Sequence, residues 1–270
     1  MISFPNAKIN LGLHILHKRP DNYHEIDSFF VPVPWCDILE ITPSQRFEWT
    51  NTGLAIDAKP EENLCVKAYL LIKEKYQLPP VRIHLHKVIP MGAGLGGGSS
   101  DGAFAIKMLN ELFSLQMTLK EQQQFATYLG SDCSFFIENK PAFVSGKGEI
   151  LEVHPQNPLQ NLWIVLIYPQ FSVNTRQAYQ HIVPQIPLKS CRDIIKHLSI
   201  STWKDFLKND FEASVFKKYP TLASIKTELY EKGAIYASMT GSGSSIYGIF
   251  HQKIDISSFS QYLVWQGKIE

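Results

Sequence analysis

The chain has 270 residues, with 26 basic and 25 acidic side chains and a formal net charge of +1 at pH 7. Hydrophobic residues make up 44%, which is enough for a sizeable core and excludes a largely disordered chain. The balanced charge gives no electrostatic reason to expect nucleic acid or a membrane surface as a partner, although local positive charge could serve a small phosphorylated ligand.

Targeting and redox signals point to the cytoplasm. The opening segment 1–8 lacks the basic and apolar regions of a signal peptide, and no run reaches the roughly 18 apolar residues of a membrane span. The four cysteines, Cys36, Cys65, Cys133 and Cys191, are scattered and form no C-x-x-C pair. We therefore expect reduced thiols and no metal site held by them. Monomer and homodimer both remain open.

The first half of the chain predicts strands interrupted by helices. Alternating apolar residues predict strands over 4–15, 39–49 and 81–87. Helical spacing predicts a helix over 63–76 and a second from about residue 100, and the capping-box pattern of Thr118 and Glu121 begins a third that ends at Gly130. Half-exposed alternation is typical of an antiparallel or mixed sheet.

The second half predicts a different arrangement. Short strands flank a hairpin or tight loop at 146–148, and two prolines within 154–160 indicate a domain boundary, which gives domains 1–155 and 156–270. Beyond it we expect strands over 162–167, 235–239 and 246–250, and helices over 175–182, 192–198, 203–218 and 222–231. The predicted fold class is α+β.

The segment Pro90–Ser100 is the most informative motif. It places five glycines within residues 92–98, which implies positive φ angles or close approach of the backbone to a ligand. The loop joins a strand to a helix, and Ser99, Ser100 and Asp101 are residue types that cap helices. Free amides and the positive end of the helix dipole then form an anion site. A mere linker rarely ends in a capped amphipathic helix.

Three known phosphate-binding motifs do not fit this loop. Residues 92–97 satisfy G-x-G-x-x-G, but the preceding strand alternates and a second helix follows, unlike a dinucleotide-binding unit. A Walker A loop needs Lys followed by Ser or Thr after its last glycine, whereas Ser99 follows Gly98. The H-R-D and D-F-G motifs of protein kinases are absent. We interpret the loop as a phosphate cradle of another kind.

Phosphoryl transfer to an alcohol requires a carboxylate that orients the hydroxyl and cations near the phosphate. Asp132, which follows the helix end at Gly130, and Lys8, inside the first strand, are candidates. The residue pattern alone favours simpler roles, because an Asp after a helix usually bonds its own turn and a strand lysine usually faces solvent. The pattern therefore leaves both roles open.

Four motifs in order resemble the galactokinase–homoserine kinase–mevalonate kinase (GHMP) superfamily. They are Phe4–Leu11, Pro90–Ser100, Gly130–Asp132 and Thr240–Gly243. Within it, the motifs at 22–25 (Asn-Tyr-His-Glu) and 145–149 are similar to the branch that phosphorylates the 2-hydroxyl of 4-diphosphocytidyl-2-C-methyl-D-erythritol. The resemblance implies two lobes, an N-terminal ATP-binding domain with a mixed or antiparallel sheet and helices and a ferredoxin-like C-terminal domain that closes the substrate cleft.

The resemblance also implies roles for individual residues. Asp132 takes the place of the catalytic base, and Lys8 that of the lysine that keeps it ionised. The residues that match the triphosphate loop are Pro90, Met91, Gly92, Ala93, Gly94, Leu95, Gly96, Gly97, Gly98, Ser99 and Ser100, and Asn63 and Lys87 match residues near the nucleotide. ATP is expected with Mg²⁺, without a dedicated carboxylate ligand beyond the loop serines and the phosphates.

The acceptor side follows from the same resemblance. Tyr23 and His24 fall where the family holds cytosine, with Tyr179 as a stacking partner, and Asn10 falls near the methylerythritol end. The second glycine loop is Thr240, Gly241, Ser242 and Gly243. The alternatives are another GHMP kinase, for homoserine or mevalonate, and a non-catalytic nucleotide-binding relative. Two residues depart from the family pattern: Gly102, where alanine is usual, and Ser134, where proline is common.

Overall fold

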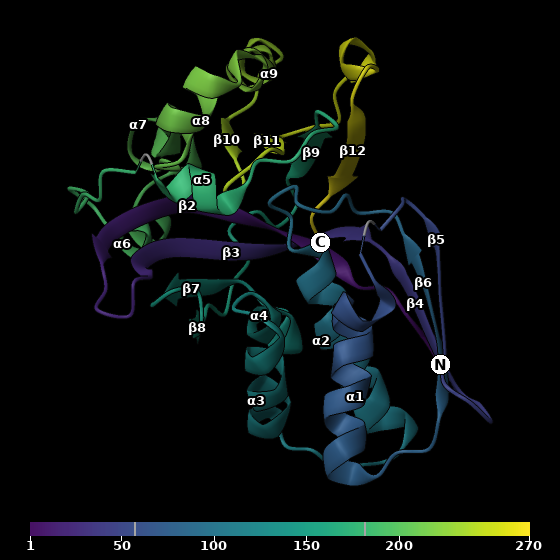
Figure 1. The fold of residues 1–270 in the computed structure, drawn as a ribbon. Coiled ribbons are helices and arrows are strands. Elements are labelled where there is room, and N and C mark those ends of the chain that lie inside the picture. The colour runs from purple at the N-terminus through teal and green to yellow at the C-terminus, as the bar shows by residue number, and fades with distance from the viewer. Residues whose placement is uncertain (57, 181) are drawn as a thin grey trace. The chain divides into compact units, whose positions relative to one another are not determined.

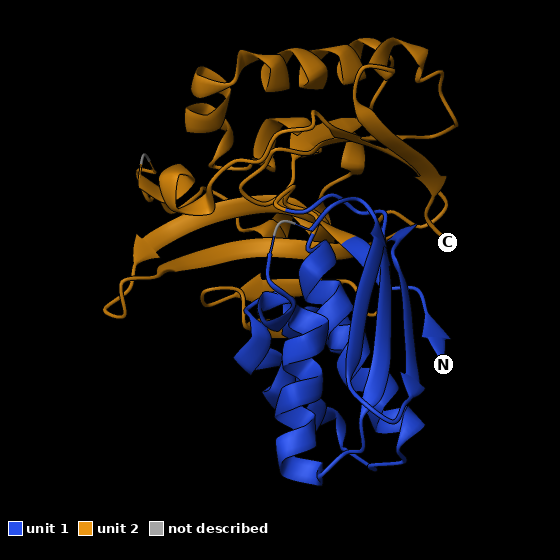
Figure 2. Cartoon of the chain, turned by 45° about the vertical axis from the view of Figure 1, so that its right-hand side comes forward, with its two compact units in different colours: residues 1–7, 35–91, 96–140 blue, residues 8–34, 92–95, 141–270 orange. Residues whose placement is uncertain are grey.

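The computed structural model describes residues 1–56, 58–180 and 182–270. The chain forms two compact units, and each is assembled from separate segments (Figure 2). Unit 1 comprises residues 1–7, 35–91 and 96–140, and unit 2 comprises 8–34, 92–95 and 141–270. This division differs from the expected domains 1–155 and 156–270. The cause is that the strands formed by residues 8–34 pair with strands beyond residue 140, which a scan for linkers does not reveal.

Unit 1 contains a mixed sheet, as predicted. Its strands are β1 (Ile2–Ser3), β4 (Ile38–Pro43), β5 (Glu48–Gly53) and β6 (Val81–Lys87), in the order β1-β4-β6-β5 (Figure 1). β5 and β6 are parallel and the other pairs are antiparallel. The single strand expected over 39–49 is two strands, because Pro43, which has no N–H to donate, ends β4.

The helices of unit 1 are η1 (Pro60–Glu62), α1 (Leu64–Tyr76), α2 (Gly97–Leu112), α3 (Leu119–Leu129) and α4 (Cys133–Glu138). Three of them, α1, α2 and α3, lie near the positions expected from the sequence. Asn63 caps α1 by accepting a bond from the Cys65 amide, and Thr118 and Glu121 form the expected capping box of α3. Gly102 has a packing reason, since a Cβ there would lie 2.9 Å from the Leu64 Cβ. α1 and α2 therefore pack closely at this glycine.

Unit 2 contains two four-stranded sheets in the described part of the chain. Two long strands, β2 (Asn6–Lys18) and β3 (His24–Cys36), run through it and join β7 (Ala142–Ser145) and β8 (Ile150–Val153) in the order β2-β3-β7-β8. The predicted hairpin at Gly146 is confirmed as the β7–β8 pair. β3 has no counterpart among the predicted strands, and Pro32 and Pro34 interrupt its pattern.

The second sheet of unit 2 is antiparallel, in the order β10-β11-β9-β12. Its strands are β9 (Trp163–Tyr168), β10 (Tyr236–Met239), β11 (Ile246–Phe250) and β12 (Leu263–Lys268). α9 (Pro220–Glu231) packs against β10 and β11 (Figure 1). This arrangement of helices on an antiparallel sheet, with the mixed sheet of unit 1, confirms the α+β class.

The remaining helices of unit 2 are short. They are α5 (Thr175–Gln180), α6 (Cys191–His197), η2 (Ile200–Thr202), α7 (Trp203–Phe206), α8 (Glu212–Lys218) and η3 (Ser257–Phe259). The single helix expected over 203–218 is broken at 207–211, and residue 181 of the helix expected over 175–182 lies outside the described residues. No helix in the described part of the chain is long and apolar enough to cross a membrane.

Candidate active site

The first half of the glycine-rich loop, residues 92–95, belongs to unit 2. Gly94 has φ +78°, and a Cβ there would lie 2.1 Å from the carbonyl oxygen of Thr240. Gly94 therefore has the positive φ that was one of the two expected reasons for glycine, and its backbone approaches that of Thr240, whereas close approach to a ligand stays a prediction. The Ser245 amide donates to the Ala93 carbonyl at 3.1 Å, and the Lys8 amide donates to the Leu95 carbonyl at 2.9 Å.

The second half of the loop belongs to unit 1 and opens α2. Gly96 is the N-cap residue, in the left-handed region at φ +70°, and no side chain caps the helix. Ser99, Ser100 and Asp101 lie inside the first turns and are not the cap, because the glycine already ends the loop. The first-turn amides thus lack a side-chain acceptor, which is the arrangement an anion can use.

A buried ion cluster lies below this end of α2. Lys87 lies on the same buried face of β6 as the apolar residues of that strand. Its ammonium forms ion pairs with Asp37 and, at 2.8 Å, with Asp101. A Cβ at Gly97 would lie 3.0 Å from the Lys87 Nζ. Asp37 also accepts bonds from the amides that follow β6. The cluster therefore supports the start of α2, and a contact between Lys87 and a nucleotide stays a prediction.

Burial and charge act in opposite directions in this cluster. Burial lowers the pKa of Lys87, but Asp101 and Asp37 outweigh it, so that the pKa of the ammonium is raised. Burial raises the pKa of Asp101 to about 7, against the lowering effect of Lys87. Asp101 is thus a carboxyl that changes its charge near neutral pH.

Lys8 and Asn10 lie side by side on β2 within unit 2. Both are buried, and the Lys8 Nζ donates to the Asn10 Oδ1 at 2.7 Å and lies 4.5 Å from the centre of the Phe30 ring. The Asn10 Oδ1 also accepts from the Gly241 amide at 3.0 Å, and its Nδ2 donates to Ser28. Asn10 therefore links Lys8 to the second glycine loop, and its contact with a substrate stays a prediction.

The second glycine loop, Thr240–Ser245, connects β10 to β11. The hydroxyl of the buried Thr240 accepts from the Asn10 amide at 3.1 Å and donates to the Gly94 carbonyl at 3.0 Å. Gly241 has φ +56°, and a Cβ there would lie 3.2 Å from the Gly94 Cα. The two glycine segments thus touch backbone to backbone within unit 2.

The remaining residues singled out in the sequence have varied surroundings. In unit 1, Asn63 caps α1, Pro90 is buried and Met91 is exposed. Nucleotide contacts stay a prediction for these three. In unit 2, the second glycine loop includes Ser242, whose hydroxyl bonds to the first residue of α5, and Gly243, which has φ +94°.

Asp132 precedes α4 directly, and α3 ends at Gly130 two residues earlier. The carboxylate is half buried. Burial raises the pKa of the neighbouring Cys133 to about 12, so this thiol is not a nucleophile at neutral pH. Asp132 belongs to unit 1 and Lys8 to unit 2 (Figure 2), and their partnership stays a prediction.

The residues expected to hold a base form a ring pair in unit 2. His24, the first residue of β3, stacks on Tyr179 of α5 with centroids 4.9 Å apart and 19° between planes. Burial, and then the charge of Lys18, lowers the pKa of His24, which favours the neutral imidazole. Tyr23 is exposed, with the Lys147 ammonium 4.5 Å from its ring centre.

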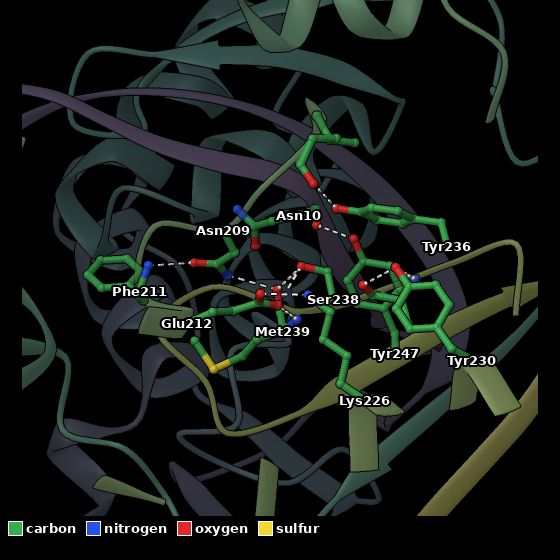
Figure 3. Close-up of polar contacts among 12 residues, drawn as sticks. Asn10, Asn209, Phe211, Glu212, Lys226, Tyr230, Tyr236, Ser238, Met239 and Tyr247 are labelled. Atoms are coloured by element: carbon green, nitrogen blue, oxygen red, sulfur yellow. Dashed lines mark hydrogen bonds and ion pairs between the residues drawn. The ribbon is translucent and has the colours of Figure 1, made fainter. Parts of the chain in front are cut away.

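Sequence reasoning missed a polar turn, residues 209–212, that breaks the predicted helix between α7 and α8. Figure 3 shows Asn209, Phe211 and Glu212 of this turn. The Asn209 Nδ2 donates to the carbonyls of Met239 and Gly241, both at 2.8 Å. Glu212 accepts from the Met239 amide at 2.8 Å and from Lys226 at 2.6 Å. Adjacent Asn and Asp residues, which favour turns over helix interiors, were the available signal.

Comparison with known proteins decides the family. Residues 63–146 match the GHMP kinases N terminal domain, and residues 189–263 match the GHMP kinases C terminal domain. A 4-diphosphocytidyl-2-C-methyl-D-erythritol kinase of Cytophaga hutchinsonii is 50% identical, over 94% of this chain and 93% of its own. The corresponding kinase of Bacteroides fragilis is 48% identical over the full length of both chains. The chain belongs to this family of GHMP kinases.

Solved structures agree with this assignment. A crystal structure of 4-(cytidine 5′-diphospho)-2C-methyl-D-erythritol kinase has a TM-score of 0.79 and 28% identity, and covers 99% of this chain and 98% of its own. The mevalonate kinase of Methanococcus jannaschii shares the fold at 13% identity, with a TM-score of 0.73, over 100% of this chain and 98% of its own. This GHMP kinase is therefore an ATP-dependent small-molecule kinase with the expected fold.

Proposed function

We propose that this kinase transfers the γ-phosphate of ATP to the 2-hydroxyl of 4-diphosphocytidyl-2-C-methyl-D-erythritol, in isoprenoid precursor biosynthesis by the non-mevalonate pathway. The observation that carries the proposal is the 48–50% identity, over nearly the whole chain, to kinases named for this substrate. The ring pair His24–Tyr179 supports it, because a flat, polar base needs an aromatic face and a hydrogen-bonding edge.

The proposed chemistry assigns one role to each reacting group. The acceptor oxygen attacks the γ-phosphorus, the bond from that phosphorus to the β–γ bridging oxygen breaks, and ADP leaves. Asp132 takes the proton of the hydroxyl, and Lys8 favours the ionised carboxylate and the developing alkoxide. The first-turn amides of α2 hold phosphate oxygens.

Mg²⁺ is expected to accompany ATP. Among the described residues, no group of three or more His, Cys, Asp or Glu side chains is arranged to hold a metal ion. The phosphates of ATP and water would then supply most of the oxygen ligands, as is usual for this ion. Among the loop serines, the buried Ser100 Oγ has no hydrogen-bond partner in the described part of the chain, which fits an additional oxygen ligand.

The cytosine of the substrate would replace the stacking contact between His24 and Tyr179. At 4.9 Å the faces of His24 and Tyr179 already touch, so a cytosine stacked on this face of Tyr179 takes the place of the imidazole. The neutral imidazole then offers one donor and one acceptor to the edge of the base. We also propose a cytoplasmic location, which the four free thiols support.

The test is a comparison of acceptors. ADP release is measured with the cytidyl substrate, its uridyl analogue, homoserine, mevalonate and galactose. We expect turnover with the cytidyl compound and a kcat/KM about 10-fold or more lower with the uridyl analogue, because the wrong base leaves buried polar groups unpaired at about 1–3 kcal/mol each.

Asp132→Asn is the matched control of this experiment. It keeps the shape of the side chain and removes the base, so turnover should fall by about 10² to 10⁴-fold while an ATP analogue still binds. Preference for homoserine or mevalonate would contradict the proposed substrate. Full turnover by Asp132→Asn would remove this residue from the mechanism and leave the substrate assignment intact.

A further inference from the structure

The polar turn at residues 209–212 contacts three parts of unit 2 that the proposed function uses. Asn209 binds the carbonyls on either side of Thr240, at the start of the second glycine loop. Asp210 accepts a bond from the Ile15 amide at 2.8 Å and so is attached to β2. Phe211 packs edge-on against Tyr179, with ring centroids 4.8 Å apart. All of these contacts are made within the protein and do not require a bound substrate.

Asn209 is well suited to fix the loop. It is buried, both hydrogens of its amide meet a carbonyl, and its Oδ1 accepts from the Phe211 amide at 3.0 Å (Figure 3). A buried amide with all these bonds has one orientation, because rotation would leave two carbonyls and an N–H unpaired. The carbonyls of Met239 and Gly241 are thereby held in place, and they flank the Thr240–Gly241 peptide plane, which carries the Gly241 N–H.

The fixed loop in turn orients Asn10. The Gly241 amide donates to the Asn10 Oδ1 at 3.0 Å, and the Thr240 hydroxyl accepts from the Asn10 amide at 3.1 Å. The same Oδ1 accepts from the Lys8 Nζ at 2.7 Å. Tyr247 holds the Asn10 carbonyl from the other side at 2.7 Å. The path from Asn209 to the Lys8 ammonium therefore consists of hydrogen bonds of 2.7–3.1 Å within one unit.

We propose that Asn209 is a positioning residue of this kinase: by holding the backbone on both sides of Thr240, it sets the direction of the Asn10 amide and so the place of the Lys8 ammonium. The proposal rests on the proposed function, in which Lys8 assists phosphoryl transfer. Displacement of a catalytic group by about 1 Å from a distant site costs up to about 100-fold in rate. Asn209 acts through Asn10 and touches no reacting atom.

The test is a double-mutant cycle on Asn209 and Asn10. Asn209→Asp keeps the shape but places carboxylate oxygens against two carbonyls. We expect kcat to fall about 10- to 100-fold while the KM for ATP changes less than about threefold. In an Asn10→Ala background the same substitution should lower kcat by less than about threefold, because the path is already broken.

The control is Tyr230→Phe, which also removes two hydrogen bonds, both to the backbone of Ala237 on β10. Tyr230→Phe should leave kcat unchanged although its loss of thermal stability is similar to that of Asn209→Asp. The proposal would be overturned if Asn209→Asp lowered kcat equally in the wild-type and Asn10→Ala backgrounds. It would also be overturned if Tyr230→Phe lowered kcat as much as Asn209→Asp does. Full turnover by Lys8→Met would instead contradict the role of Lys8 in the proposed function.

A second variant covers the case in which Asn209→Asp does not fold. Thr240→Val keeps the shape of the side chain and removes the hydroxyl that meets Asn10. It should lower kcat about 10-fold, and by less than about threefold once Asn10 is alanine. Wild-type kcat in Thr240→Val would show that the loop does not orient Asn10, and the proposal would fail.

Discussion

The two units bury polar groups beside the glycine-rich loop in contrasting ways. Unit 1 places three charged groups, Lys87, Asp37 and Asp101, below residues 96–100. Unit 2 surrounds residues 92–95 with neutral amides, hydroxyls and backbone groups. A charged cluster is strongly destabilised when one member is lost and responds to pH, whereas a neutral network depends on shape and on complete pairing. Three variants separate these cases.

The largest effect is expected when the buried cation of unit 1 is removed. Lys87→Met leaves Asp37 and Asp101 without their partner, and we expect the free energy of unfolding to fall by about 3–5 kcal/mol. Lys67→Met, on the exposed face of α1, is the matched control and should change stability by no more than about 0.5 kcal/mol. Denaturant melts of both variants provide the measurement.

The charge interpretation of this variant can itself be tested. Adding Asp101→Asn to Lys87→Met removes one uncompensated carboxyl and should restore part of the lost stability. If the double variant is no more stable than Lys87→Met, or if Lys87→Met costs less than about 1 kcal/mol, the cluster acts by packing and not by charge.

A smaller effect is expected where unit 2 depends on shape. Gly94→Ala forces a Cβ toward the Thr240 carbonyl and places alanine at a positive φ, which should cost about 2–3 kcal/mol. Gly98→Ala is the control, since a Cβ there meets nothing nearer than 3.9 Å and alanine favours helices. Its stability should stay equal or rise by up to about 1 kcal/mol. Equal melting temperatures for the two variants would refute the shape requirement at Gly94.

The smallest effect, counted per pH unit, is a pH dependence of the free energy of unfolding that we expect from the charged cluster. The pKa of Asp101 rises from 3.8 to about 7 on folding, so the folded protein binds more protons between these values. Its contribution to stability is therefore present at low pH and is lost as the pH rises toward 7, by at most about 1.4 kcal/mol per pH unit. Asp101→Asn should remove this slope between pH 5 and 7. An unchanged slope in the variant would assign it to other groups.

Local signals predicted local structure well. The capping box at Thr118 and the hairpin at Gly146 each depend on residues within a few positions of one another, and both are confirmed. The start of α2 was placed three residues too late, because Ser99 and Ser100 are better cap types than Gly96 and the left-handed backbone of a glycine is not visible in the pattern.

The parts that the sequence did not predict depend on distant partners. The alternation along β6 puts Lys87 on the apolar face of the strand. Its partner Asp37 lies 50 residues away, and no local pattern links the two residues. Asn209 lies inside the single helix expected over 203–218, and only the fold brings the carbonyl of Gly241 to it, from 32 positions further along the chain. The resemblance of the motifs identified the family and the two glycine loops. Side chains that hold these loops in place, such as Asn209, belong to no motif and were therefore not found.

The division of the chain into interleaved segments has a consequence for how the enzyme is made. Asn10 and Gly241, which meet at 3.0 Å, are 231 residues apart. At a synthesis rate of about 5–20 residues per second, the ribosome completes Gly241 roughly 10–50 s after Asn10. Unit 1 has its full sequence once residue 140 has emerged, whereas the residues around Lys8 wait for almost the whole chain. A prematurely terminated chain can thus contain every residue of unit 1 and still lack the partners that place Lys8.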